Sequence, residues 1–514
     1  MTAIGHFSVL SETKFNPSIV TFFMTLKGQP LTSKDFIALW KDRGMPAQHP
    51  RFHSVTDTHA VGYFQQHQHA AAENEESLDA YLDTHITETL APCTSQYRAD
   101  LRARIQSLQT LQWPLTESLW HAYVGTSSSP SATATATCEY PNQDTPTESI
   151  VLFRGHHALA DGASMGAALL DLCDEAAAQK QQIRLVLAKR RPKGFWARMY
   201  RTMQRLLWLL TGSVQSVTHQ LHLYVRQWWD PDPWAVLKHT AAAAAGKGNQ
   251  DAAADRSISW SAAAPVDQAK WIATTLGGSK TTINDVFCSC VTAALAKQLE
   301  WHRNYRASTS NSILDGNTLS ILPRQEHMHV AVPVHLKGGI ILPGESVSNQ
   351  LGAFCVRLPG EVTVESTSAS NAATRRLQAV HQELYRIKRT PAAYFSHWSA
   401  RALTQCMHLL PASWAPVLFA KASAGAVAVV TNVRGAPTTV HMASREVQGI
   451  YGFVPLPPGI PVGVVVSSYA GNMSLTVTAE PWAVPDADRF MSWILEEYLV
   501  LLQEAKNKSK KSQV

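Results

Sequence analysis

The chain has 514 residues, 45% of them hydrophobic, and a formal net charge of +6 at pH 7. This length exceeds what one hydrophobic core usually supports, so we expect two lobes. The seven cysteines are scattered and form neither a disulfide framework nor paired CxxC ligands, which predicts a reducing compartment and no metal site. Residues 1–15 lack an apolar core behind a basic end, so we expect no secretory signal.

A pair of adjacent histidines follows the second of two predicted strands, residues 119–124 and 148–153. The full motif is an HHxxxDG pattern before a predicted buried helix over 163–172, with the sequence His156-His157-Ala158-Leu159-Ala160-Asp161-Gly162. A neutral imidazole can take a proton from a hydroxyl or an amine as that group attacks a carbonyl. We therefore interpret His157 as a candidate general base.

Three other residues of this motif belong to the candidate site. Asp161 either orients the imidazole of His157 or locks the turn, and His156 is expected to support the loop. We group both with His157 as candidate catalytic residues. Gly162 permits either a sharp backbone turn or the close passage of a substrate. The alternative is that these residues merely cap a strand and open a helix, which the complete spacing disfavours.

A basic segment follows the predicted helix. Between Arg184 and Arg226 the sequence contains no acidic residue, and apolar residues recur at helical spacing from 196 to 228. Such an amphipathic helix or helix pair suits an anionic membrane surface. Residues 206–225 lack charge but carry too many polar groups for a membrane span, so we expect residues 184–228 to lie on a membrane. The alternative is that the apolar stripe packs on the protein itself.

An alanine-rich stretch, residues 240–255, predicts a linker that divides the chain. Strands and helices follow one another irregularly on both sides of it, which favours α/β lobes with mixed sheets. We expect four parts, namely an N-terminal lobe over 1–180, a basic connection with the linker over 181–256, a C-terminal lobe over 257–505 and a frayed basic tail over 506–514.

Short motifs in the rest of the chain place the histidine motif in a family. Pro114-Leu115 with Leu119-Trp120 precedes the histidines, and three further segments follow them in order. These are Thr282-Ile283-Asn284-Asp285-Val286, Thr431-Asn432-Val433-Arg434-Gly435 and Tyr469-Ala470-Gly471. In this order the set resembles the wax ester synthase/diacylglycerol acyltransferase family of the chloramphenicol acetyltransferase-like superfamily. Three residues inserted before Leu119, and Arg434 where the family often has proline, depart from its pattern.

The resemblance implies a pseudodimer of two chloramphenicol acetyltransferase-like lobes, with mixed sheets flanked by helices and an interlobe tunnel that holds the histidines. It implies an acyl-CoA-dependent O-acyltransferase that esterifies a long-chain fatty alcohol or diacylglycerol, giving wax ester, triacylglycerol or both, with His157 as the base. Acyl-CoA is then a substrate, and no cofactor is expected. Asn284 and Asn432 are candidates for binding the oxyanion or supporting the site, together with Asp285; each asparagine is equally well read as a turn or cap residue.

Other functions have less support in the sequence. The chain has no GxSxG elbow, no GxxxxGK[ST] loop and no GxGxxG after a strand, which disfavours a serine nucleophile, nucleotide hydrolysis and dinucleotide chemistry. No nucleic-acid-binding module accompanies the basic segment, so we expect no nucleic-acid partner. The alternatives are a related HHxxxDG transferase with another alcohol or amine acceptor, and a non-catalytic lipid-surface protein. We expect an intracellular, membrane-associated enzyme, at the endoplasmic reticulum or lipid droplets in a eukaryote or inside the plasma membrane in a bacterium.

Overall fold

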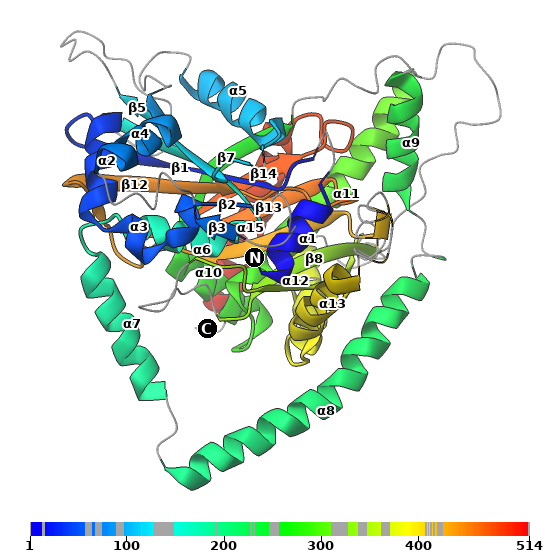
Figure 1. Cartoon of the computed structure of the whole chain (residues 1–514). Coiled ribbons are helices and arrows are strands. Elements are labelled where there is room, and N and C mark those ends of the chain that lie inside the picture. Colours follow the sequence, from blue (N-terminus) through cyan, green and yellow to red (C-terminus); the bar gives the residue numbers. More distant parts are fainter. Residues whose placement is uncertain are drawn as a thin grey trace.

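Two mixed sheets with helices on their faces make up the molecule (Figure 1). The computed structural model describes residues 2–12, 16–56, 64–66, 75–88, 97–114, 116–126, 149–190, 194–226, 229, 232–245, 256–309, 327–337, 347–360, 371–406, 409, 411, 414, 417–418 and 425–511. Within them each large sheet has six strands, and a two-stranded ribbon, β2 (Ser54–Thr56) with β3 (Phe64–Gln66), accompanies them. The expected α/β fold with mixed sheets flanked by helices is confirmed, whereas the interlobe tunnel stays a prediction.

The first sheet has the strand order β11-β12-β1-β6-β5-β4. Its strands are β1 (Ile19–Lys27), β4 (Ile86–Glu88), β5 (Trp120–Thr126), β6 (Ser149–His156), β11 (His441–Met442) and β12 (Arg445–Phe453). Strand β1 pairs with both β6 and β12 in antiparallel register, and β6 is buried along its whole length. Because both faces of these central strands are covered, their sequences are nearly continuous apolar runs.

The second sheet has the order β7-β14-β13-β10-β8-β9. Its strands are β7 (Ser257–Pro265), β8 (His327–His335), β9 (Leu351–Pro359), β10 (Ala428–Arg434), β13 (Val462–Tyr469) and β14 (Asn472–Ala479). Strand β10 runs parallel to both β13 and β8, so the carboxyl ends of these three strands meet at one edge. That edge lies beside the histidine motif.

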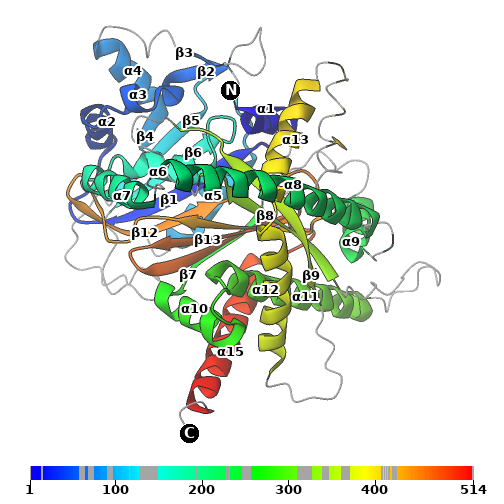
Figure 2. The same ribbon diagram turned by 90° about the horizontal axis from the view of Figure 1, so that it is seen from below.

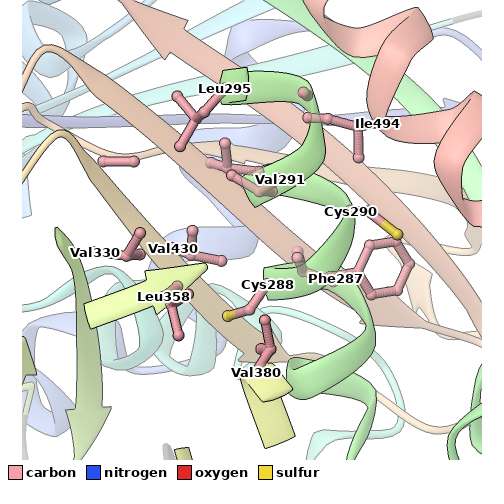
Figure 3. Close-up of a cluster of buried hydrophobic side chains, with 14 of the residues drawn as sticks. Phe287, Cys288, Cys290, Val291, Leu295, Val330, Leu358, Val380, Val430 and Ile494 are labelled. Atoms are coloured by element: carbon pink, nitrogen blue, oxygen red, sulfur yellow. The ribbon is translucent and has the colours of Figure 1, made fainter. Parts of the chain in front are cut away.

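One face of the second sheet carries the larger hydrophobic core. Three long helices cover it, namely α11 (Ile283–Thr309), α12 (Ala372–Lys388) and α15 (Ala487–Lys511). Figure 3 shows Phe287 and Val291 of α11 among the strand residues Val330 and Val430 and the helix residue Ile494. The remaining helices of the two lobes are α1 (Ala3–Leu10), α2 (Ser33–Asp42), α3 (Met45–Gln48), α4 (Glu75–His85), α5 (Tyr97–Thr110), α6 (Gly162–Leu170), α10 (Val266–Ile272) and α13 (Ala392–Cys406).

The two lobes are interlocked. Strands β11 and β12 come from the C-terminal half of the chain, yet they extend the first sheet, where Phe453 pairs with Thr21. The predicted boundaries at 180 and 257 therefore do not separate the two sheets, because composition does not show which edge strand a later segment will join. The predicted frayed tail is also wrong up to Lys511, since α15 continues to that residue and buries Ala505. Residues 512–514 lie outside the described part of the chain.

The connection between the lobes contains three helices, α7 (Ala176–Arg190), α8 (Phe195–Arg226) and α9 (Pro233–Ala245). Helix α9 packs Trp234 and Leu237 into the core of the second lobe. The first residues of the predicted linker, 240–245, therefore form the last turns of α9. Residues 246–255 of the linker lie outside the described residues. So do 191–193, 227 and 228 of the basic segment. Among the described helices, none is both long enough and apolar enough to cross a bilayer.

Helix α8 lies along one side of the molecule with two different faces (Figures 1 and 2). One face packs on the second lobe: His219 lies 3.1 Å from the carbonyl of Cys355, Leu223 is fully buried, and Gly212 lies so close to Pro391 that a Cβ atom would come within 2.4 Å of its ring. At 3.6 residues per turn, the apolar stripe is on the opposite face.

The stripe on α8 is exposed to solvent. Its members are between 41% and 73% exposed, and they are Phe195, Trp196, Met199, Tyr200, Met203, Leu206, Leu207, Leu210, Val214, Val217, Leu221, Tyr224 and Val225. The alternative that this stripe packs on the protein itself is therefore wrong. The packed face combines Gly212 and His219 with Leu223, and such a mixed face is not detected by apolar periodicity.

Candidate active site

The histidine motif follows a buried strand and ends at a helix, as the sequence predicts. Strand β6 ends at His156, and the backbone N–H of His157 donates to the carbonyl of Ser18 at 2.7 Å. The N–H of Leu159 then donates to the carbonyl of His156 at 2.9 Å, which closes a tight turn before α6. Both histidines therefore lie where the first sheet meets the segment that precedes β1.

His156 is a structural residue of this loop. Its side chain is fully buried, and its Nδ1 accepts a hydrogen bond from the N–H of Ala158 at 2.9 Å. The neutral ring therefore carries its hydrogen on Nε2, which bonds the carboxylate of Glu12. With both nitrogens engaged, His156 has no lone pair free for a substrate. This geometry fits the prediction that His156 supports the loop. It does not fit a role for His156 in proton transfer.

His157 has the geometry of a base. Its ring is partly buried, and its Nδ1 lies 3.4 Å from the hydroxyl of Ser8 in α1. Burial lowers the pKa of His157 below its usual value, His156 adds to this, and Asp161 and the backbone carbonyl of His157 oppose it. The imidazole is therefore neutral at pH 7, which is the form that accepts a proton.

The second lobe holds the backbone of His157. Asn349, just before β9, donates from Nδ2 to the carbonyl of His157 at 2.8 Å and to that of Ala158 at 3.4 Å. The Asn349 side chain is almost completely buried. The position of the base is thus fixed by hydrogen bonds from both lobes.

Asp161 locks the turn rather than orienting the imidazole. It is the fully buried N-cap of α6, where one carboxylate oxygen accepts from the N–H of Ser164 at 2.8 Å. The other oxygen accepts from the N–H of Gln350 at 2.9 Å and lies 3.7 Å from Nε2 of His335, both in the second lobe. Within the described residues no hydrogen bond joins Asp161 to His157, so its effect on the base is electrostatic and positional.

Gly162 does not make the sharp turn that the sequence predicts. It is the first residue of α6 and has no positive φ, and a Cβ atom there would meet Val20 at an ordinary 3.6 Å. The turn is made by the Asp161 cap, which leads into a regular helix. Close passage of a substrate at Gly162 stays a prediction.

Several residues that hold the histidine loop were not found from the sequence. They are Ser8, Glu12, Ser18, His335 and Gln350, which come from the N-terminal segment and from the second lobe. No spacing links them to the histidine motif, because the contacts arise only when segments far apart in the chain pack together. Asn349 lies between the Asn284 and Asn432 segments in the chain, and no spacing indicates that it holds the base.

Asn284 and Asn432 lie together in a pocket of about 390 Å³ at the start of α11. Asn284 is in the first turn of the helix and Asn432 is near the carboxyl end of β10. Within the described residues, the hydrogen bonds of the histidine loop do not reach either asparagine. The structure therefore brings the two asparagines together, but it gives neither a hydrogen bond to the base.

Asp285 beside them is structural. Its carboxylate accepts from the N–H of Thr282 at 3.0 Å, and its own N–H donates to the Thr282 hydroxyl at 3.4 Å, which forms a capping box. The buried carboxylate also pairs with Lys388 at 2.7 Å and His381 at 2.8 Å. These contacts fix α11 against α12, and they occupy both carboxylate oxygens of Asp285.

We expect Asp161→Asn to lower the free energy of unfolding by about 1–3 kcal/mol, because the amide cannot accept from both Ser164 and Gln350 without leaving a buried group unpaired. Urea denaturation measures this change. Asp79→Asn, at an exposed ion pair with Lys41, is the control and should change stability by less than about 1 kcal/mol. Equal stability of the two variants would contradict the bridging role of Asp161.

Comparisons with known proteins agree with this architecture. Residues 347–501 match the family model described as the WS/DGAT C-terminal domain. The wax ester synthase/diacylglycerol acyltransferase from Marinobacter aquaeolei VT8 is 13% identical, with 98% of each chain covered and a TM-score of 0.53. A trichothecene 15-O-acetyltransferase from Fusarium sporotrichioides is 11% identical, covering 98% of this chain and 94% of its own, with a TM-score of 0.57.

The starter condensation domain of rhizomide synthetase is 10% identical, covering 96% of this chain and 93% of its own, with a TM-score of 0.50. No curated protein matches the chain. The structural similarities show a shared two-lobed fold, and the family model over residues 347–501 supports an acyltransferase. The resemblance of the chain to the wax ester synthase/diacylglycerol acyltransferase family is thereby confirmed, and residues 347–501 are similar to the C-terminal domain of that family.

Proposed function

We propose that the chain is an acyl-CoA-dependent O-acyltransferase that esterifies a long-chain fatty alcohol, diacylglycerol or both, giving wax ester and triacylglycerol. The observation that carries this proposal is His157, a neutral imidazole that Ser18 of the first lobe and Asn349 of the second lobe hold in place. The starter condensation domain of rhizomide synthetase was solved in complex with C8-CoA, which supports an acyl-CoA donor for this fold.

In the proposed reaction, His157 takes the proton of the acceptor hydroxyl. The resulting alkoxide-like oxygen attacks the thioester carbonyl and forms a tetrahedral intermediate with an oxyanion. This intermediate collapses as the C–S bond breaks. The leaving thiolate then takes the proton from His157, so the base is regenerated without an acyl-enzyme. General base catalysis contributes a factor of roughly a hundred to ten thousand, and hydrogen-bond donors to the oxyanion supply a comparable part.

We propose that the apolar stripe of α8 binds a membrane or lipid-droplet surface. Soluble proteins rarely expose so long an apolar patch, and the formal net charge of +6 favours an anionic surface. On the packed face of α8, Trp208 meets Tyr394 of α13 with ring centroids 6.0 Å apart, and Tyr394 and Trp398 are themselves partly exposed. The endoplasmic reticulum or lipid droplets in a eukaryote, or the inner plasma membrane in a bacterium, offer such a surface.

Helix contacts connect the helix that carries the stripe with the base. Helix α13 packs against both α8 and α1, and Ser8 of α1 contacts His157. We propose that an alcohol or diacylglycerol dissolved in the lipid phase reaches the histidine loop from this side. The two proposals are consistent, because a lipid-soluble acceptor is found at the surface that the stripe is proposed to bind.

His157→Ala should abolish ester formation while leaving the free energy of unfolding within about 1 kcal/mol of the wild type, since a base is removed and the loop bonds use its backbone. The assay incubates enzyme with labelled palmitoyl-CoA and a mixture of hexadecanol and diacylglycerol, then separates the lipids. Near-normal turnover by the variant would contradict the assignment of the base. No labelled neutral lipid from the wild type would contradict the proposed function.

The pH dependence of kcat/KM tests the protonation state of His157. The neutral form is active, and burial lowers its pKa below the usual 6.5, so activity should persist at pH 6.5 and fall at lower pH. The midpoint of the acid limb is measured from initial rates between pH 4.5 and pH 8. A midpoint above 6.5 would show that another group, or a differently placed imidazole, controls the rate.

Replacing Met203 and Leu210 together with glutamate should weaken binding to anionic vesicles about tenfold or more, because two side chains lose their apolar environment. Cosedimentation with vesicles of phosphatidylserine and phosphatidylcholine measures the bound fraction. The matched control, Gln204→Glu with Gln215→Glu, adds the same charge beside the stripe and should bind more tightly than the first variant. Equal binding of the two variants would mean that net charge, and not the stripe, holds the protein on the lipid.

A further inference from the structure

We propose that Ser8 is a positioning residue of the proposed base: its hydroxyl accepts a hydrogen bond from Nδ1 of His157, which leaves Nε2 as the atom that takes the substrate proton. This inference rests on the proposed function, because it concerns how the same base works. Ser8 lies in α1 and belongs to none of the motifs on which the family resemblance depends.

The hydroxyl of Ser8 has a single hydrogen, which is used within α1. Its Oγ donates to the carbonyl of Ile4, one helical turn earlier, at 2.9 Å. Serine side chains inside helices commonly make this bond. A hydroxyl has one donor and two acceptor positions, so toward any further partner the oxygen of Ser8 can only accept.

The further partner is the ring of His157. Nδ1 of His157 lies 3.4 Å from the oxygen of Ser8. Because this oxygen accepts, Nδ1 carries the hydrogen of the neutral ring. The lone pair of a neutral imidazole is then on the other nitrogen, Nε2. The direction of the Ser8 hydrogen bonds therefore identifies the nitrogen that can take a proton.

A second acceptor selects the same tautomer. The backbone carbonyl of His157 raises the pKa of its own ring through a hydrogen bond, and Nδ1 is the ring nitrogen nearer to the chain. The same carbonyl also accepts from Nδ2 of Asn349 at 2.8 Å, so it serves two donors. Ser8 adds a further acceptor for the hydrogen on Nδ1. Its 3.4 Å distance fits a hydrogen that is shared between two acceptors.

Ser8 is held firmly beside the base. Its side chain is only 6% exposed. Its backbone carbonyl accepts from the hydroxyls of Ser11 at 3.1 Å and Ser18 at 3.3 Å, and the carbonyl of Ser18 accepts from the N–H of His157. Helix α1 also packs against α13 (Figures 1 and 2). The serine and the base are thus fixed to one network of hydrogen bonds.

The other histidine of the pair has the opposite tautomer. Its Nε2 donates to the carboxylate of Glu12, and its Nδ1 lone pair accepts from the N–H of Ala158. In His157 the lone pair is on Nε2, for which the described part of the chain shows no hydrogen-bond partner. Glu12 and Ser8, from the same N-terminal segment, therefore account for the different roles of His156 and His157.

The Ser8 oxygen assists proton transfer in two ways. It holds the tautomer whose Nε2 takes the hydroxyl proton, and it stabilises the positive charge that the ring then acquires, while the hydrogen on Nδ1 stays in place. In serine proteases a buried carboxylate has this role, and its replacement by an amide lowers kcat about ten-thousandfold. A hydroxyl is a weaker acceptor, and a neutral hydrogen bond typically contributes a factor of about two to ten.

The variant Ser8→Ala tests the assignment in the acyl transfer assay. We expect kcat to fall about fivefold or more and KM to stay within about twofold, because proton transfer is impaired and substrate binding is not. The acid limb of kcat/KM should move to lower pH by about 0.5 unit, since loss of the acceptor disfavours the imidazolium. His156 and Asp161, the titratable groups that act on the ring, are unchanged in this variant.

Nitrogen NMR of protein labelled with nitrogen-15 in histidine shows the tautomer directly and does not depend on turnover. The signals of His157 are those that His157→Ala lacks. At pH 8 we expect the wild-type Nδ1 to have the chemical shift of a protonated nitrogen and Nε2 that of an unprotonated one. In Ser8→Ala both shifts should move toward each other, because the tautomer is held less strictly.

The matched control is Ser216→Ala. Ser216 is a buried helical serine of α8 that donates to the carbonyl of Gly212, four residues earlier, at 2.8 Å. Its replacement should leave kcat and the acid limb unchanged. A wild-type ring with its hydrogen on Nε2, wild-type kcat and acid limb in Ser8→Ala, or an equal loss in the control would each overturn the assignment. If the wild type transfers no acyl group but its tautomer depends on Ser8, the proposed function fails and the positioning role stands.

Discussion

The buried carboxylate of Asp161 holds the arrangement of the candidate site together. One oxygen caps α6 through Ser164, and the other accepts from Gln350 in the second lobe, so a single side chain fixes the histidine loop against both lobes. A buried carboxylate without hydrogen-bond donors is strongly unfavourable, so the lobes cannot move apart here without a large loss of free energy. Asn349 adds a bond to the backbone of His157, and the base is thus held in place before any substrate arrives.

The interlocking of the lobes reinforces this constraint. Strand β12 from the C-terminal half pairs with β1 of the first sheet, and the histidine loop continues from β6 on the other side of β1. The three strands form one hydrogen-bonded ladder, so a displacement of the C-terminal half would disturb the base directly. A rigid junction of this kind suits a reaction that depends on placing an acceptor oxygen and a thioester carbonyl correctly with respect to one imidazole.

Helix α8 and helix α11 lie on opposite faces of the second sheet. The packed face of α8 uses Gly212, His219 and Leu223, which leaves its apolar stripe free for lipid. The pocket that holds Asn284 and Asn432 lies on the other face, at the start of α11.

The sequence by itself determined the strand, the histidine pair and the helix around His157, the mixed sheets, the amphipathic character of α8 and the family resemblance, because each depends on local periodicity or on ordered motifs. Only the tertiary structure decided that Asp161 and His156 hold the loop, that Ser8, Glu12 and Asn349 surround the base, and that Asn284 and Asn432 share a pocket with Arg434. It also decided that β12 joins the first sheet and that the stripe of α8 faces outward. The physical reason is that most of these contacts join segments far apart in the chain, and they form only when the chain folds and its two lobes pack.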